Sequence, residues 1–321
     1  MCKKDYLMRN RIAILMATYN GEKFIQQQLE SILNQTYKKF DLIIRDDGST
    51  DDTLTIIEKV KNKNPDFSIT ILKNQKNEHG QVKNFAYLFA YAYSKDVYDY
   101  ILFSDQDDIW LKDKVLNSLN EIKKHRNVPA LVYTNYQVWN MKSNVKNIAY
   151  GYRKKEEFSK LFVQNWTMGC TYILNKKMMD LVKGIPTKVE NHDYWLALVA
   201  SISNGLYYYP KVTMVHRIHD NNVTTSSNSN STYIRAKNMY INNFTVVGRV
   251  RKYKSWSCTV DNLIKIFGNN KCLKEVKAIL LSNSIKSVIL AHRYHFGGIN
   301  KRTTFLFYLY LISKNNFFRK I

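Results

Sequence analysis

Acidic side chains cluster in two short segments of this chain, Asp46-Asp47 and Asp105-Gln106-Asp107-Asp108. The whole chain is basic, with 49 Lys and Arg residues against 26 Asp and Glu residues, so these like charges need a reason to lie together. A divalent cation is the simplest reason, because Mg²⁺ and Mn²⁺ prefer carboxylate oxygens and keep positions open for substrate phosphates. The clusters therefore predict a magnesium or manganese site that holds a nucleotide diphosphate.

Common phosphate-binding motifs are missing from the sequence. It contains no GxxxxGK[ST] and no GxGxxG after the first apolar run, which excludes the P-loop and the dinucleotide fingerprint. The metal and scattered basic groups must then hold the phosphates. The four cysteines show no CxxC spacing and no nearby histidine pairs, so we expect neither a zinc site nor a disulfide framework, and a reduced, cytoplasmic setting.

The elements that position these residues alternate along the first hundred residues. Apolar runs predict strands over 11–17, 40–45, 68–72 and 98–104, and helical spacing of apolar residues predicts helices over 23–33, 54–60 and 82–93. Strands that alternate with helices form parallel sheets, which bind ligands outside the carboxyl ends of the strands. The polar segments all follow such ends, so we predict an α/β fold with its site at that edge.

Length and composition restrict the class of protein. A chain of 321 residues with 45% hydrophobic and 13% aromatic residues is neither disordered nor fibrous, and it is long enough for a sizeable core. The apolar run 12–17 is too short for a signal peptide, so we expect no export signal. The run 305–312 is far below the roughly 20 residues of a membrane-spanning helix, so we expect no such helix.

Four segments carry a resemblance to a known family. In order they are ATYNGEKFIQQQLESILNQTYKKFDLIIRDDGSTDDT, FSDQDDIW, NHDYWLALVAS and HRIHDNNVT, over roughly residues 11–225. This combination resembles the family 2 inverting glycosyltransferases of the GT-A fold, and most of all the rhamnosyltransferases of bacterial capsule, O-antigen and cell-wall polysaccharides. It implies a GT-A nucleotide-diphospho-sugar transferase fold over residues 1–232, with a mainly parallel sheet flanked by helices.

The resemblance also implies roles for residues on the donor side. Ala17, Thr18 and Tyr19 line the nucleotide base, with the Tyr19 ring stacked on it, and Asp47 accepts a hydrogen bond from the base. In the DxD pair, Asp105 lies near the ribose and Asp107 binds the metal at the diphosphate. Asp108 has a supporting role. Lys83, in the segment GQVKNF, is a further candidate for contact with phosphate.

An inverting transfer needs one carboxylate that takes the proton from the acceptor hydroxyl as this hydroxyl attacks the anomeric carbon. Asp193 is the candidate, since the resembled family commonly has a Glu-Asp pair here. In this chain His192 replaces the first member, which leaves a role for His192 in doubt. The alternative for Asp193 is an N-cap of a helix over residues 194–201.

The segment HRIHDNN resembles the Arg-x-His-x-x-Asn segment of the family. Arg217 offsets charge on the diphosphate through bidentate hydrogen bonds, and His219 binds the metal or a phosphate, although a lone histidine is more often structural. Residues 166–171 match the stretch that closes over sugar and acceptor, or they form a buried strand with a glycine bulge. The QxxRW motif of processive synthases is absent, which favours one or a few additions per acceptor.

The last quarter of the chain is a basic, aromatic-rich module. Residues 233–321 hold 17 Lys and Arg residues and two acidic residues, a net charge of +15 within a formal total of +23. Apolar residues recur at helical spacing in 273–280 and 285–289, which predicts amphipathic helices. Such helices suit an anionic membrane surface, and they also suit RNA or DNA phosphates. The charge can also reflect general compositional bias.

The predicted activity is transfer of L-rhamnose from dTDP-L-rhamnose to a lipid-linked saccharide, by a protein held peripherally at the cytoplasmic face of the cell membrane. A transferase of the same fold that uses UDP-galactose, UDP-glucose or a UDP-N-acetylhexosamine is the alternative. A nucleic-acid-binding protein is disfavoured, since the Asp clusters repel a polyanion, so no nucleic-acid partner is expected. A nonenzymatic scaffold with this fold is a third class.

Overall fold

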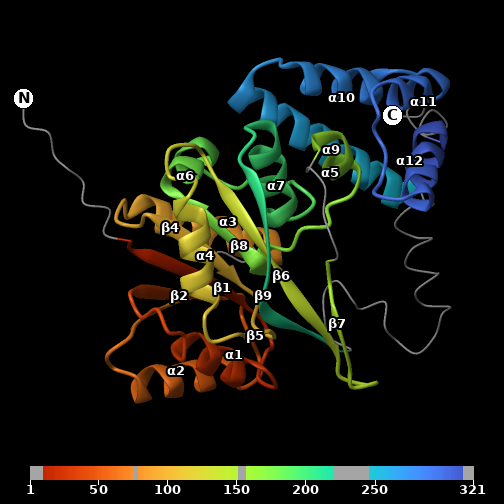
Figure 1. The fold of residues 1–321 in the computed structure, drawn as a ribbon. Helices are drawn as coiled ribbons and strands as arrows, with labels where there is room; N and C mark the ends of the chain where they lie inside the picture. The colour runs from red at the N-terminus through yellow and green to blue at the C-terminus, as the bar shows by residue number, and fades with distance from the viewer. Residues whose placement is uncertain (1–9, 75–78, 151–156, 220–245, 314–321) are drawn as a thin grey trace, which may run out of the picture. The chain divides into compact units, whose positions relative to one another are not determined.

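The computed structural model describes residues 10–74, 79–150, 157–219 and 246–313. Its first elements alternate as predicted (Figure 1): β1 (Ile12–Thr18), α1 (Ile25–Leu33), β2 (Phe40–Asp46), α2 (Thr53–Lys63), β3 (Ser68–Lys73), α3 (Gln81–Ser94) and β4 (Tyr100–Ser104). The apolar runs of β1, β2 and β4 are buried almost throughout, as expected for strands covered on both faces. The predicted boundaries differ from the observed ones by at most three residues, the largest difference being at the end of α2.

Shorter strands and further helices follow. They are β5 (Ile109–Trp110), α4 (Lys114–Lys123), β6 (Leu131–Asn140), β7 (Val145–Ile148), α5 (Phe158–Val163), η1 (Gly169–Thr171), β8 (Tyr172–Asn175), α6 (Lys176–Val182), α7 (His192–Ile202), β9 (Leu206–Ile218), α9 (Val246–Phe267), α10 (Lys271–Leu281), α11 (Ser284–Arg293) and α12 (Lys301–Ser313). Residues 169–171 form a 3₁₀ turn, so the alternative of a strand with a glycine bulge is wrong there.

One mixed sheet contains the nine described strands in the order β3-β2-β1-β4-β8-β6-β9-β5, with β7 paired to β6. β1 pairs in parallel with β2 and β4, and β2 pairs in parallel with β3, as predicted. The pairs of β8 with β4 and β6 are antiparallel, as is the pair of β5 and β9. In this register Thr18 lies beside Asp46, and Met16 beside Ser104, so the polar segments after β1, β2 and β4 emerge at one edge.

The chain divides into two compact units. The sheet unit comprises Met1–Arg153, Met168–Thr187 and Gly205–Arg217, and the helical unit comprises Lys154–Thr167, Lys188–Asn204 and Ile218–Ile321. The helical unit therefore includes α7 as well as the C-terminal helices. The expected boundary between a 1–232 domain and a 233–321 module lies outside the described residues, so it stays a prediction.

The helical unit has its own core. Trp256 of α9 packs against Phe162 of α5 and against Phe307 and Tyr310 of α12, with ring centroids 5.0 to 5.6 Å apart. α10 buries the stripe that its spacing predicts, Leu273, Val276, Ile279 and Leu280. Among the described residues, no helix combines the length and the apolar character needed to cross a bilayer.

Candidate active site

The turn after β2 is closed by Asp46. Its Oδ2 accepts hydrogen bonds from the backbone N–H groups of Gly48 (2.9 Å) and Ser49 (2.8 Å), and its Oδ1 accepts one from Thr18 Oγ1 (3.0 Å). Gly48 has a φ of +90°, a conformation that glycine adopts without strain. The first acidic residue of the pair therefore shapes the turn and ties it to the end of β1.

Asp47 is buried and connects β2 to the start of α3. Its Oδ2 accepts a hydrogen bond from the backbone N–H of Gly80 (2.7 Å), and its Oδ1 accepts one from Asn74 Nδ2 (2.9 Å). Arg45 Nη1 lies 3.6 Å from the same Oδ1. Each carboxylate oxygen can accept more than one hydrogen bond, so these contacts orient the group and leave it able to accept another.

Tyr19 and Gln106 join the ends of β1 and β4. The Gln106 side-chain amide accepts a hydrogen bond from Tyr19 N (2.9 Å) and donates one to Tyr19 O (2.9 Å). This approach is close: a Cβ on Gly21 would lie 2.4 Å from Gln106 Oε1. The Tyr19 side chain is 54% exposed, which leaves its ring accessible for stacking, whereas Thr18 is buried and Ala17 is partly buried.

Arg217 is buried at the end of β9 and holds the loop after β4. Its Nε donates to Asp107 O (2.5 Å), its Nη2 to Asp108 O (3.1 Å) and its Nη1 to Gln27 Oε1 (2.5 Å). Its guanidinium also lies 4.8 Å from the centre of the Phe24 ring. These contacts join the DQDD loop to α1, so Arg217 has a positioning role in the structure beside its predicted contact with phosphate.

A buried ion pair lies beneath the DQDD loop. Asp108 Oδ1 and His216 Nδ1 are 2.7 Å apart, and Asp108 is fully buried. Burial alone would lower the pKa of His216, but the Asp108 carboxylate raises that pKa to about 9, so the imidazole is protonated at neutral pH. The sequence analysis singled out Asp108 but did not predict its pairing with His216, because the two residues are 108 positions apart and no local pattern connects them.

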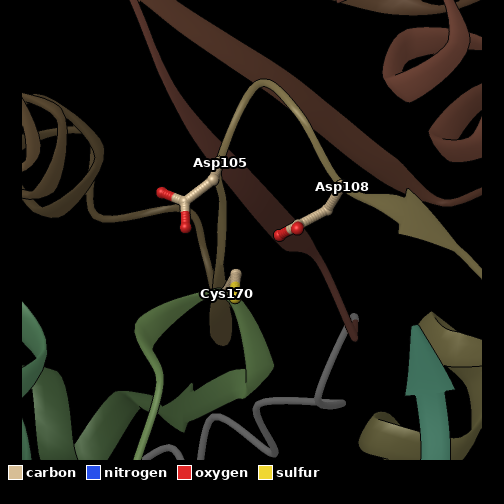
Figure 2. Close-up of side chains that lie close together, drawn as sticks. All are labelled: Asp105, Asp108 and Cys170. Carbon is tan, nitrogen blue, oxygen red and sulfur yellow. The ribbon is translucent and has the colours of Figure 1, made fainter. Parts of the chain in front are cut away.

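Three side chains that could bind a cation gather at this loop. Asp105, Asp108 and Cys170 each offer a ligand atom, and these atoms lie within 4.8 Å of one another. Figure 2 shows the Asp108 carboxylate directed toward the space between Asp105 and Cys170. The metal ligands predicted from the resemblance, Asp107 and His219, are not members of this group, and Cys170 was not among the predicted ligands. Asp107 is partly buried on the same loop.

The donor set suits a hard cation. Asp108 Oδ2 is buried and has no hydrogen-bond partner in the described structure, so a cation would satisfy it. Carboxylate oxygens are the ligands that Mg²⁺ and Mn²⁺ prefer. Burial, reinforced by the nearby Asp108 carboxylate, raises the pKa of the Cys170 thiol well above its usual range. A hard cation at this loop would bind the carboxylates in preference to the soft thiol.

Lys114, at the start of α4, is a buried cation in the same unit. Its Nζ lies 4.9 Å from the centre of the Trp110 ring and 3.4 Å from Thr213 Oγ1. Burial lowers the pKa of Lys114 to about 8, and the Asp108 carboxylate acts in the opposite direction. Lys114, His216 and Arg217 therefore bring three basic groups to the surroundings of a loop with three carboxylates.

The remaining predicted residues lie partly in the other unit. Lys83 is in the first turn of α3 and partly buried, whereas Asp193 and His219 belong to the helical unit. Asp193 lies in the first turn of α7, and its Oδ1 accepts a hydrogen bond from Tyr194 N (2.6 Å). Asn191 occupies the N-cap position, so the alternative of Asp193 as the N-cap is wrong. Burial lowers the pKa of His192 to about 3, which makes it a neutral imidazole.

The comparison with protein families decides the classification. A model of the family described as glycosyl transferase family 2 matches residues 13–181, more than half of the chain. The chain belongs to glycosyl transferase family 2. The sheet edge with Thr18, Asp47 and the DQDD loop lies within the matched residues.

Two relatives of this family 2 glycosyltransferase have named activities. The dTDP-rhamnosyl transferase RfbG of Shigella flexneri is 36% identical over 219 residues, 64% of this chain and 72% of that protein. The Escherichia coli enzyme WfgD, a UDP-Glc:alpha-D-GlcNAc-diphosphoundecaprenol beta-1,3-glucosyltransferase, is 29% identical over 197 residues, 61% of this chain and 70% of that protein.

A solved structure agrees in fold. The mannosyltransferase PcManGT from Pyrobaculum calidifontis, in complex with GDP-Man and Mn²⁺, matches with a TM-score of 0.52 and 14% identity, over 97% of this chain and 88% of that one. The predictions of a GT-A fold with C-terminal helices, and of a family 2 hexosyltransferase similar to rhamnosyltransferases, are confirmed.

Proposed function

We propose that this enzyme transfers L-rhamnose from dTDP-L-rhamnose to a lipid-linked saccharide, with inversion, in the synthesis of a bacterial capsule, O-antigen or cell-wall polysaccharide. The similarity to a dTDP-rhamnosyl transferase supports the donor, and the name of the WfgD relative supports a lipid-linked acceptor. Such an acceptor lies in the membrane, so we place the enzyme peripherally at the cytoplasmic face.

The observation that carries the proposal is the convergence of the segments after β1, β2 and β4 at one sheet edge. There the exposed Tyr19 ring stacks on the base, next to Ala17 and Thr18, and Asp47 accepts a hydrogen bond from it. Asp105 approaches the ribose. The two hydrogen bonds of the Gln106 side chain fix the Tyr19 backbone, so this part of the site is ordered before the donor binds.

Acidic residues of the DQDD loop would hold a divalent cation, which when bound would offset the negative charge of the leaving group. Asp107 is the proposed main ligand, and Asp105 and Asp108 complete the acidic surroundings. His219 is a further proposed ligand from the resemblance. Lys83 and Arg217 add positive charge toward the phosphates. Because Arg217 holds the carbonyls of Asp107 and Asp108, it also fixes the orientation of this loop.

Asp193 is the proposed general base. It accepts the proton of the acceptor hydroxyl while the oxygen of that hydroxyl bonds to the anomeric carbon. The bond from this carbon to the diphosphate oxygen breaks, and the nucleoside diphosphate leaves with the electron pair. Attack opposite the leaving group turns a β-linked donor into an α-L-rhamnoside. The first turn of α7 favours the ionised carboxylate, since a helix N-terminus stabilises negative charge.

The test is release of nucleoside diphosphate from a panel of purified nucleotide sugars, with an acceptor extract, in the presence of Mg²⁺, Mn²⁺ or a chelator. We expect turnover of dTDP-L-rhamnose only, and only with a metal. Asp107→Ala should abolish it, and Asp66→Ala, a change of an exposed carboxylate elsewhere in the sheet unit, should not. Full activity in the chelator, or equal loss in both variants, would contradict the proposed metal site.

UDP-glucose is the second candidate donor, because the WfgD relative is named as a glucosyltransferase that uses it. The same panel separates the two donors. Turnover of UDP-glucose with dTDP-L-rhamnose inert would replace the rhamnosyl assignment and leave the metal and base assignments in place.

A further inference from the structure

Helix α11 turns small side chains toward the protein and large apolar side chains toward solvent. Ser284, Ser287 and Ala291 are buried, and Ser287 Oγ donates a hydrogen bond to Ile279 O (2.7 Å). Ile285 is 75% exposed and Ile289 is 60% exposed. These two residues are one helical turn apart and therefore lie on one face. A surface helix whose outer face meets only water normally turns its large apolar residues toward the core and its polar residues toward solvent.

Basic residues accompany this apolar pair. Lys286 and Arg293 are exposed on the same side of α11, and we call Ile285, Lys286, Ile289 and Arg293 the α11 outer face. Leu281, the last residue of α10, is 69% exposed just before it. Residues 271–302 hold seven Lys and Arg residues and one Glu, a net charge of +6. The face thus offers adjacent apolar side chains in a positively charged neighbourhood.

We propose that the α11 outer face binds an anionic membrane surface. Helices that lie in the membrane interface insert large apolar side chains below the headgroups and place Lys and Arg at the level of the lipid phosphates. The negative potential of a cytoplasmic leaflet attracts such charges within about 10 Å. Ile285 and Ile289 supply the inserting side chains, and Lys286 and Arg293 supply the charges.

Charge argues against other occupants. A second copy of the chain docked face to face would bring two net charges of +6 together with only a few apolar side chains between them. A nucleic acid would pair with the charges but would leave Ile285 and Ile289 without apolar contacts. An anionic lipid surface matches both the charge and the apolar side chains. This inference does not depend on the identity of the donor sugar.

The experiment is flotation of the full chain with vesicles of phosphatidylcholine alone or mixed with phosphatidylglycerol. We expect binding to the mixed vesicles that weakens as salt increases, and little binding to phosphatidylcholine alone. Ile285→Glu with Ile289→Glu should reduce the partition coefficient by about tenfold or more, because it removes the inserting side chains and adds negative charge.

The matched control is Val145→Glu with Ile148→Glu on β7. These residues are 49% and 63% exposed, so the control makes the same change of charge at exposed apolar positions of the sheet unit. It should retain binding within a few-fold of wild type. Both double variants should keep the wild-type thermal midpoint. If the Glu variant is less stable, Ile285→Ser with Ile289→Ser makes the same comparison without added charge.

Three outcomes overturn the inference. One is that the wild-type protein does not bind vesicles that contain phosphatidylglycerol. Another is that both double variants lose binding equally, which indicates an effect of net charge alone. The third is that the α11 variant changes the sedimentation coefficient from dimer to monomer with vesicle binding unchanged, which assigns the face to a second copy. Loss of donor turnover in wild type bears on the proposed function and leaves the vesicle result independent.

Discussion

The two units depart from the ordinary distribution of side chains in opposite ways. The sheet unit buries charged groups: Asp108, Lys114 and Arg217 are almost inaccessible to solvent. The helical unit exposes apolar groups, Ile285 and Ile289 among them. Buried charges and adjacent exposed apolar side chains are both costly, and both mark places where a ligand or surface completes the structure. We therefore expect the sheet unit to bind a small charged ligand and the helical unit to contact an extended anionic and apolar surface.

The largest expected effect concerns the proposed base. Asp193→Asn should reduce sugar transfer about 10³-fold with little change in donor affinity, because general base catalysis contributes roughly 10²–10⁴-fold and the amide cannot accept the proton. Single-turnover transfer and donor titration measure the two quantities. Glu190→Gln, the same change on an exposed residue just before α7, is the control. Transfer by the Asn variant at the wild-type rate would remove Asp193 from the mechanism.

The next prediction tests whether α10 and α11 differ as described. Leu273→Ala on α10 should lower the free energy of unfolding by about 2–5 kcal/mol, since it leaves a cavity in the core. Ile285→Ala on α11 should change it by less than about 0.5 kcal/mol, because that side chain contacts mainly solvent. Urea denaturation measures both. A comparable loss for Ile285→Ala would mean that another part of the chain covers α11.

The sequence was sufficient for the regular part of the fold. The runs that became β1, β2 and β4 are apolar throughout, so their type and order were readable, and the resemblance extended them to a GT-A fold. The antiparallel strands of the sheet could not be predicted from the sequence, because β5 has two residues and β8 has four, which is too few for a periodic pattern. The outward turn of α11 was not readable either, since spacing does not say which face meets the core.

Within the site, residue types were more predictable than their partners. The apolar pattern placed Asp47, Asp105 and Asp107 after strand ends, where the structure has them, and the resemblance supplied their expected roles. The contacts of Asp108 with His216 and of Arg217 with the DQDD loop join residues more than 100 positions apart. Cys170 reaches the loop from η1 in the same way. Such pairings depend on tertiary packing, which no local pattern encodes.

The Asp108–His216 pair predicts how stability depends on pH. The folded pKa of His216, about 9, lies above its ordinary value of 6.5, so its stabilisation is complete below pH 6.5 and is lost as pH rises toward 9. Between pH 7 and pH 8 the free energy of unfolding of wild type should fall by about 1.2 kcal/mol more than that of His216→Gln. Lys114 and His192 are present in both proteins, so their titration cancels to first order. Denaturation curves at the two pH values measure the difference.

The control for this prediction is His292→Gln, which replaces an exposed histidine of α11 in the helical unit. It should retain the wild-type dependence on pH, because no buried carboxylate pairs with it among the described residues. If His292→Gln reduced the dependence of the free energy of unfolding on pH as much as His216→Gln does, the buried Asp108–His216 pair would not be the cause of that dependence.

The smallest effect concerns the link between Tyr19 and Gln106. The Cβ of Gly21→Ala would meet the end of the Gln106 side chain, which is partly exposed and can turn away at little cost in stability. The two hydrogen bonds to the Tyr19 backbone would be lost. We therefore expect the KM for the donor to rise about two- to fivefold with kcat nearly unchanged, which corresponds to a loss of less than about 1 kcal/mol in binding free energy.

Gly184→Ala is the control for this link, because the structure has open space where its Cβ would lie, and it should leave the donor KM unchanged. Gln106→Ala removes the same two hydrogen bonds by another route. If Gly21→Ala acts only through Gln106, the double variant should match Gln106→Ala alone, since two changes that remove one interaction are not additive. Additive increases in KM would show instead that Gly21 affects the donor directly.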